Sequence, residues 1–197
     1  MNFVRTVLKY WLVLALVITA LSGMVYLTVQ QSFRLGANDP QIQMAEDAAA
    51  ALESGQPAAG LVPPGKVDIA RSLAPYLIVF GPDGKALASN AVLHGQTPAL
   101  PDGVLDYTRR NGEDRISYQP EPGVRSAAVI AAVNGGQGGF VLAGRSLREV
   151  EKRIDLLGLQ VGAAWAAAIL ASLALVSVLE ALSLARSRWA ARPAAGL

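Results

Sequence analysis

Two long apolar runs, at residues 10–29 and 156–179, dominate the pattern of hydrophobic and polar positions along the chain. Neither run contains a charged residue. A helix needs about 20 residues to cross a hydrocarbon layer roughly 30 Å thick, and each run is long enough. Within lipid, a helix satisfies its own backbone polar groups, so both runs are predicted to be transmembrane helices.

The first apolar run is predicted to be an uncleaved anchor, with a long signal peptide as the alternative. A signal-peptide core is typically about 7–15 residues long, and this run is longer. A small-x-small cleavage site is missing near its end, since Ile18 stands two residues before Ala20. The Lys and Arg residues beside the two runs divide equally between the two sides, five on each. The first helix usually dominates and long middle segments translocate largely regardless of charge, so Arg5 and Lys9 before the first run, against Arg34 after it, favour cytoplasmic termini and a middle segment outside.

Between the apolar runs, the pattern is that of a small mixed domain. Residues 39–53 carry apolar positions three and four apart, and Asp39-Pro40 at their start predicts a helix capped by Asp39. Residues 56–64 are rich in Pro, Gly and Ala, and residues 91–100 contain Pro98. Both segments are predicted to be loops. A short helix is expected at residues 102–110.

Five segments rich in β-prone residues are predicted to form one antiparallel sheet. They cover residues 74–80, 85–90, 115–119, 124–133 and 139–145. The first two are joined by Gly81-Pro82-Asp83-Gly84, in which Pro presets φ and Gly accepts a positive φ. Helices mixed with antiparallel strands indicate an α+β domain with a single small core.

These elements predict five consecutive parts of the chain. They are a cytoplasmic N-terminus at residues 1–9, a span at 10–29, an extracytoplasmic domain at 30–155, a second span at 156–180 and a short cytoplasmic tail at 181–197. No Pro or turn cluster interrupts residues 146–184, so one helix is expected to run from the last strand into the second span. Pairs such as Arg148–Glu151 and Glu149–Arg153 would stabilise its first turns by about 0.2–0.5 kcal/mol each.

Composition narrows the functional classes. Hydrophobic residues make up 52% of the chain, and the excess over a soluble domain lies in the two apolar runs. The 17 basic and 15 acidic residues are interleaved, without the basic stripe of a nucleic-acid-binding protein. The absence of Cys excludes disulfides and thiolate metal sites.

No enzymatic activity, cofactor or metal is expected. The single histidine, His94, stands in a predicted loop, and no Ser-His-Asp set has a recognisable context. The acids around the short helix are interpreted as capping and solvated residues, with a calcium site as the less favoured alternative. These acids are Asp102, Asp106, Glu113 and Asp114.

At residues 80–89, the segment Phe-Gly-Pro-Asp-Gly-Lys-Ala-Leu-Ala-Ser resembles the central hairpin of PAS-like sensor domains of the Cache type. Residues 144–151, Gly-Arg-Ser-Leu-Arg-Glu-Val-Glu, are similar to the juxtamembrane exit of bacterial sensor histidine kinases. The resemblance implies a PAS-like domain with a long N-terminal helix and a five-stranded sheet, held in the bacterial inner membrane by two flanking transmembrane helices.

The sequence departs from such receptors because it contains neither a HAMP linker nor a kinase part. A sensor of this kind would need a separate kinase or other membrane complex to transmit its signal. A receptor remnant that has lost its transmitter is a further alternative.

In a PAS-like sheet, a small molecule would lie against the concave face, and arginines could bind its carboxylate through two parallel hydrogen bonds. Candidates for this role are Tyr107, Arg109, Arg110, Arg115, Tyr118 and Arg125. The alternative is that the arginines are surface charges paired with acids close in sequence. The sequence does not show the amino-acid-binding motif of the better-known Cache receptors.

Gly158 and Gly162 form a G-x-x-x-G pair, which Ala166 extends by one turn. Small residues at this spacing let helices approach closely in lipid. We expect association with a second copy, giving a homodimer, or with the chain's own first span. A chance spacing in an Ala- and Gly-rich helix is the alternative.

The predicted function is that of a membrane-anchored extracytoplasmic sensor or ligand-binding protein that signals through a partner. The second hypothesis is a structural subunit for envelope assembly or secretion, which binds proteins through its outer domain.

Overall fold

The computed structural model describes residues 3–135 and 138–190 and has an α+β fold. The chain divides into two compact units. One unit consists of Met1–Gln31 together with Ile154–Leu197, and the other of Ser32–Arg153.

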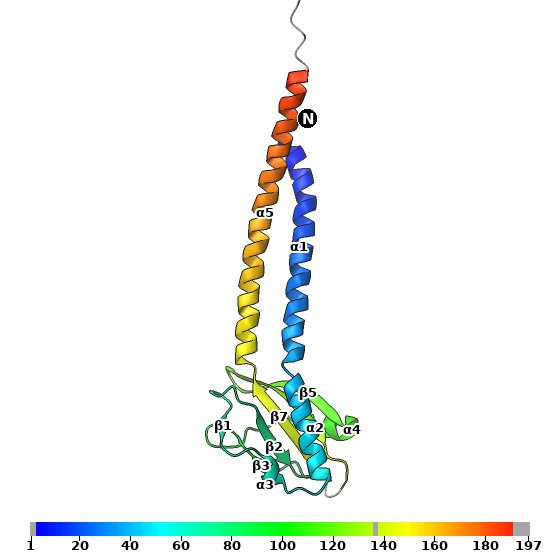
Figure 1. Ribbon diagram of the computed structural model, residues 1–197, viewed down its shortest axis with the longest axis vertical. Helices are drawn as coiled ribbons and strands as arrows, with labels where there is room; N and C mark the ends of the chain where they lie inside the picture. Colours follow the sequence, from blue (N-terminus) through cyan, green and yellow to red (C-terminus); the bar gives the residue numbers. More distant parts are fainter. Residues whose placement is uncertain (1–2, 136–137, 191–197) are drawn as a thin grey trace, which may run out of the picture. The chain divides into compact units, whose positions relative to one another are not determined.

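The second unit is built on a five-stranded antiparallel sheet, as the sequence predicts (Figure 1). Its strands follow the order β3-β2-β7-β6-β5. They are β2 (Tyr76–Phe80), β3 (Ala86–Ser89), β5 (Glu113–Glu121), β6 (Val124–Ala132) and β7 (Phe140–Ser146). The last strand therefore lies in the middle of the sheet, between β2 and β6.

The two faces of this sheet hold separate clusters of buried side chains. On one face, Leu77 and Val129 pack with Ala45 of helix α2 (Asp39–Glu53), which lies along that face in Figure 1. On the other, Tyr76 and Ile130 belong to a cluster covered by helix α4 (Val104–Asn111) and neighbouring segments. Side chains alternate between the faces because successive residues of a strand point to opposite sides.

A short parallel pair of strands, which the sequence analysis missed, adds to the cover of the second face. It consists of β1 (Val67–Asp68) and β4 (Ala91–Val92). The prediction of a loop throughout residues 91–100 was therefore wrong at its start. Strands of two residues carry too little periodicity to be recognised, and their partners are distant in sequence. The predicted loop at residues 56–64 likewise contains a four-residue helix, α3 (Ala58–Leu61).

The predicted cap of α2 was also wrong. Asp39 is the first helical residue, and Asn38 holds the cap position without a side-chain capping hydrogen bond. The physical reason is that α1 (Phe3–Gly36) ends only two residues before α2, and Asn38 has helical backbone angles. An extended cap residue, which would direct its side chain at the free N–H groups, is therefore absent at this position.

The first unit contains most of the two long helices, α1 and α5 (Arg148–Ala190), side by side in Figure 1. Both are long and apolar enough to cross a membrane. Helix α5 is continuous across the predicted boundary between domain and span. At its start, however, the ion pairs differ from the expected ones. Glu149 pairs with Lys152, and Glu151 pairs with Arg125 of β6.

Candidate functional site

The junction between β7 and α5 is the candidate site, because there the sheet passes into a long apolar helix without a loop. Leu147 alone separates Ser146, the last residue of β7, from Arg148, the first residue of α5. The Leu147 N–H donates to the carbonyl of Arg125 over 2.9 Å, and the Glu151 N–H donates to the carbonyl of Leu147 over 2.9 Å. Leu147 is itself buried. The hydrogen bonds of the sheet thus lead directly into those of the helix.

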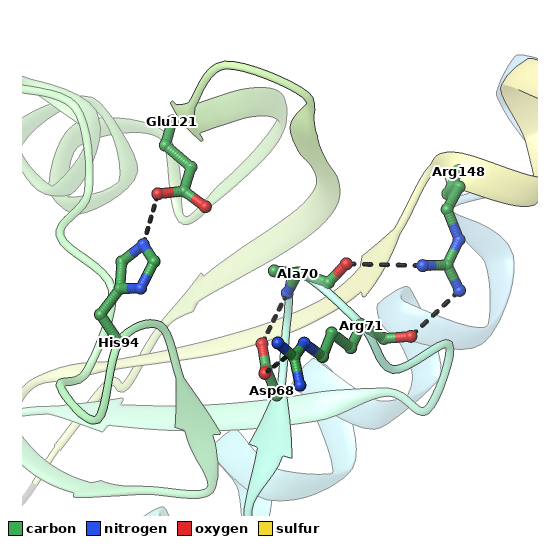
Figure 2. A network of polar contacts seen from close by, with 6 residues as sticks. All are labelled: Asp68, Ala70, Arg71, His94, Glu121 and Arg148. Carbon is green, nitrogen blue, oxygen red and sulfur yellow. Dashed lines mark hydrogen bonds and ion pairs between the residues drawn. The ribbon is translucent and has the colours of Figure 1, made fainter.

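Side chains attach the first turn of α5 to the rest of the domain at two further places. Arg125 Nη1 lies 2.6 Å from Glu151 Oε1, joining β6 to α5. The Arg148 guanidinium donates to the carbonyls of Ala70 and Arg71 over 3.4 and 3.0 Å, as Figure 2 shows. An ion pair as exposed as Arg125–Glu151 contributes only about 0–1 kcal/mol, and together with the Arg148 hydrogen bonds it attaches the first turn of α5 to the sheet domain.

Next to this junction is a cavity of about 250 Å³, which we call the junction pocket. Its wall comes from the last turn of α1 and the residue that follows it, from the end of β7 and from the first turns of α5, with Leu73 and Ala127. Arg145 lines it and donates from Nε to the carbonyl of Leu73 over 3.2 Å. Glu149 also lines it, and a hydrogen bond from Lys152 holds the pKa of its carboxyl below the ordinary value.

The sheet face that carries Tyr118 is filled by side chains of the domain. Tyr76, Ile78, Ile130 and Leu142 are fully buried there. Tyr118 is buried beside them, and its hydroxyl oxygen lies 2.9 Å from that of Tyr76. Burial raises the pKa of both phenols. The structure therefore places Tyr118 in the core.

The other candidate residues for ligand binding lie on the surface of α4, β5 and β6. Arg109 pairs with Asp106 over 2.8 Å and stacks 5.1 Å from the centre of the Phe140 ring. Arg115 pairs with Glu113. Tyr107 and Arg110 are exposed on α4, and Arg125 takes part in the junction.

These residues are not gathered around one cavity. Arg109 lines a groove of about 590 Å³ between the β2–β3 turn and the residues leading into α4, and that lining includes none of the other five candidates. Around the same helix, Asp102, Asp106, Glu113 and Asp114 do not gather into a metal-binding group, nor do any other acids or His in residues 3–135 and 138–190.

The small-residue face of α5 meets α1 of the same chain at Gly158, where an added Cβ would lie 3.6 Å from Cε2 of Tyr26. Trp165 Nε1 donates to Thr19 Oγ1 over 2.9 Å, which holds the same two helices together. Gly162 has open space where a Cβ would stand, and Ala166 is exposed. Within the single chain, Gly158 therefore lies against the first apolar helix, and association with a second copy stays a prediction.

The sequence analysis did not single out the junction pocket, because its walls come from segments more than a hundred residues apart. The only signal in the sequence was the concentration of charge between the last strand and the second apolar run. Comparison of the chain with protein-family models, with curated proteins and with solved structures finds no match.

Proposed function

We propose that this chain is a sensor or ligand-binding protein, anchored in the bacterial inner membrane by α1 and α5, with both termini in the cytoplasm. Its sheet domain, of the PAS-like Cache type, would lie outside the cytoplasm and report a change of state to a partner protein. The two long apolar helices and the order of elements between them support this proposal.

The observation that carries the proposal is the loop-free passage from β7 to α5. A flexible linker at this point would absorb any shift of the sheet. Instead, Leu147 is hydrogen-bonded to β6, and Arg125, Glu151 and Arg148 hold the first turn of α5 to the domain. A displacement of β6 or β7 would therefore move the base of the apolar helix.

The proposed mechanism is a small shift of β7 and α5 between two arrangements. A ligand or protein that binds one arrangement more tightly would shift the population by its difference in affinity. Packed interfaces switch between discrete arrangements, so a sub-ångström change in the sheet can become a larger one at the helix. A separate kinase or other membrane complex would receive the change from α5.

The second candidate function is that of a structural subunit for envelope assembly or secretion. The filled sheet faces favour it, because Tyr76, Tyr118 and their neighbours pack on one face, and α2 packs against Leu77 and Val129 on the other. In that case the exposed surface of the outer domain would bind proteins, and the junction would serve only to hold the domain at the membrane.

Thermal unfolding of the full chain in detergent, measured across a library of small metabolites, separates the two functions. A sensor should unfold at a higher temperature in the presence of at least one compound. A structural subunit should respond to none and should copurify with envelope proteins.

Coupling is tested by inserting Gly-Ser-Gly between Ser146 and Leu147. Photo-crosslinkers at Leu159 and Leu170, both exposed on α5, would capture the partner in membranes. Insertion should abolish any ligand-dependent change in crosslinking while ligand-induced stabilisation persists. An unchanged response would rule out the junction as the coupler.

A further inference from the structure

The junction pocket carries more positive than negative charge at its wall. Arg145 and Arg153 line it together with the single acid Glu149, which Lys152 already pairs over 3.0 Å. Arg145 donates from Nε to the carbonyl of Leu73, and its two Nη groups donate no hydrogen bond to any of the described residues. Within those residues, Arg153 attracts the Glu149 carboxylate electrostatically but makes no hydrogen bond or ion pair with it or with another residue. Two arginines with unused donors suit an anion with several oxygens.

The rest of the wall is partly apolar. Phe33 of α1, Leu73 and Val150 of α5 line the pocket alongside the arginines. A free inorganic anion would gain nothing from these side chains. A ligand with a charged head and an apolar continuation would use both parts of the wall.

The pocket also lies at a defined distance along the chain from both apolar runs. Ser32 stands three residues after residue 29, and Arg153 three residues before residue 156. Three residues of helix span about 4.5 Å. The polar layer of a bilayer adds about 5–7 Å on each side of the hydrocarbon core. A helix that crosses the membrane over either run would therefore bring these residues to the level of the phospholipid headgroups.

We propose that the junction pocket binds the headgroup of an anionic phospholipid, with the phosphate held by Arg145 and Arg153. The acyl chains would leave along the apolar side of the pocket. This inference rests on the membrane anchoring in the proposed function, and it adds a lipid partner at the point where the sheet joins α5. A lipid bound there would contact both β7 and α5. The lipid composition of the membrane would then shift the equilibrium between the two proposed arrangements of this junction.

The test uses the full chain reconstituted into nanodiscs of equal parts phosphatidylglycerol and phosphatidylcholine, with the retained lipids counted by native mass spectrometry. The wild-type chain should retain phosphatidylglycerol preferentially. Arg153→Gln should reduce that preference about fivefold, the loss expected for one arginine near a lipid surface. Arg145→Gln combined with Arg153→Gln should abolish it, whereas Arg153→Lys should retain most of it.

Arg110→Gln is the matched control, because Arg110 is an exposed arginine on α4 that does not line the pocket. An equal loss of preference in this variant, or an unchanged preference in Arg153→Gln, would overturn the proposal. Displacement of the lipid by millimolar glycerol phosphate or inorganic phosphate would identify a free anion as the ligand, which would also overturn it.

Extraction of native membranes with alkaline carbonate tests the anchoring separately. Release of the chain would contradict the proposed function as well as this inference. Retention of the chain without preference for phosphatidylglycerol would contradict the lipid site alone.

Discussion

The ring of Tyr76 lies against Gly144, its registered partner on the neighbouring strand β7. A Cβ added to Gly144 would stand 2.6 Å from Tyr76 Cε2, and closer still to Cζ and the hydroxyl oxygen. A real Cβ atom essentially never comes this close to another heavy atom that is not bonded to it. Because glycine has no side chain, the buried Tyr76 ring can pack directly on the backbone of the central strand, two residues before β7 ends at Ser146.

Gly144→Ala is therefore expected to lower the free energy of unfolding by about 1–3 kcal/mol, as overpacking of a core does. Urea unfolding of the full chain in detergent measures the change. Gly60→Ala is the matched control, since its Cβ would lie at an ordinary 3.8 Å from Pro57 Cγ. In a chain that also carries Tyr76→Leu, Gly144→Ala should lower the free energy of unfolding by less, because the tyrosine ring that meets the added Cβ is gone. An unchanged cost would show that another contact is responsible.

Alkaline pH is expected to unfold the domain through its two buried phenols. Burial raises the pKa of Tyr76 and Tyr118 above the ordinary value of 10.0, so the unfolded chain loses these protons first. Stability should be constant below about pH 10 and fall above it, by up to about 1.4 kcal/mol per pH unit for each tyrosine.

Chemical unfolding between pH 8 and 11 measures this dependence, and absorbance at 295 nm reports phenolate formation. Tyr118→Phe should give a shallower decline, although it also removes the hydrogen bond to Tyr76 and costs about 1 kcal/mol at neutral pH. A decline equal to that of the wild type would contradict the assignment.

Gln41 is fully buried on α2, and neither its amide oxygen nor its amide nitrogen has a hydrogen-bond partner among the described residues. Burying an amide without partners costs about 1–3 kcal/mol. Gln41→Met should therefore raise the free energy of unfolding by about 1–2 kcal/mol. The control is Gln43→Met, because Gln43 is exposed and donates to Asp47 over 2.7 Å. A loss of stability in Gln41→Met would show that the amide is hydrogen-bonded in solution.

The proposed topology can be tested without background labelling, because the chain contains no cysteine. Gln119 on β5 and Ser187 on α5 are both exposed. In cells with a permeable outer envelope, a membrane-impermeant maleimide should label Gln119→Cys and should label Ser187→Cys only after the inner membrane is opened. The reverse result would place the sheet domain in the cytoplasm.

Much of the local structure could be predicted from the chain alone. The apolar runs at residues 10–29 and 156–179 predict helices because their length and lack of charge leave few alternatives. The Gly81-Pro82-Asp83-Gly84 segment predicts its turn, and Gly84 has the positive φ of 79° that such a turn needs. These signals are local, and each depends on a few neighbouring residues.

Tertiary structure alone decided which distant residues meet. Arg125 was a candidate for ligand binding until the register of β6 with β7 brought it to Glu151, which lies 26 residues away. The register of β2 with β7 places Tyr76 against Gly144, and the pairing of β5 with β6 brings Tyr118 into the core beside Tyr76. A strand pattern gives the two faces of each strand, but it does not give the order of strands or their alignment, because both depend on long-range pairing. The junction pocket follows from that pairing, since its walls come together only after the sheet has formed.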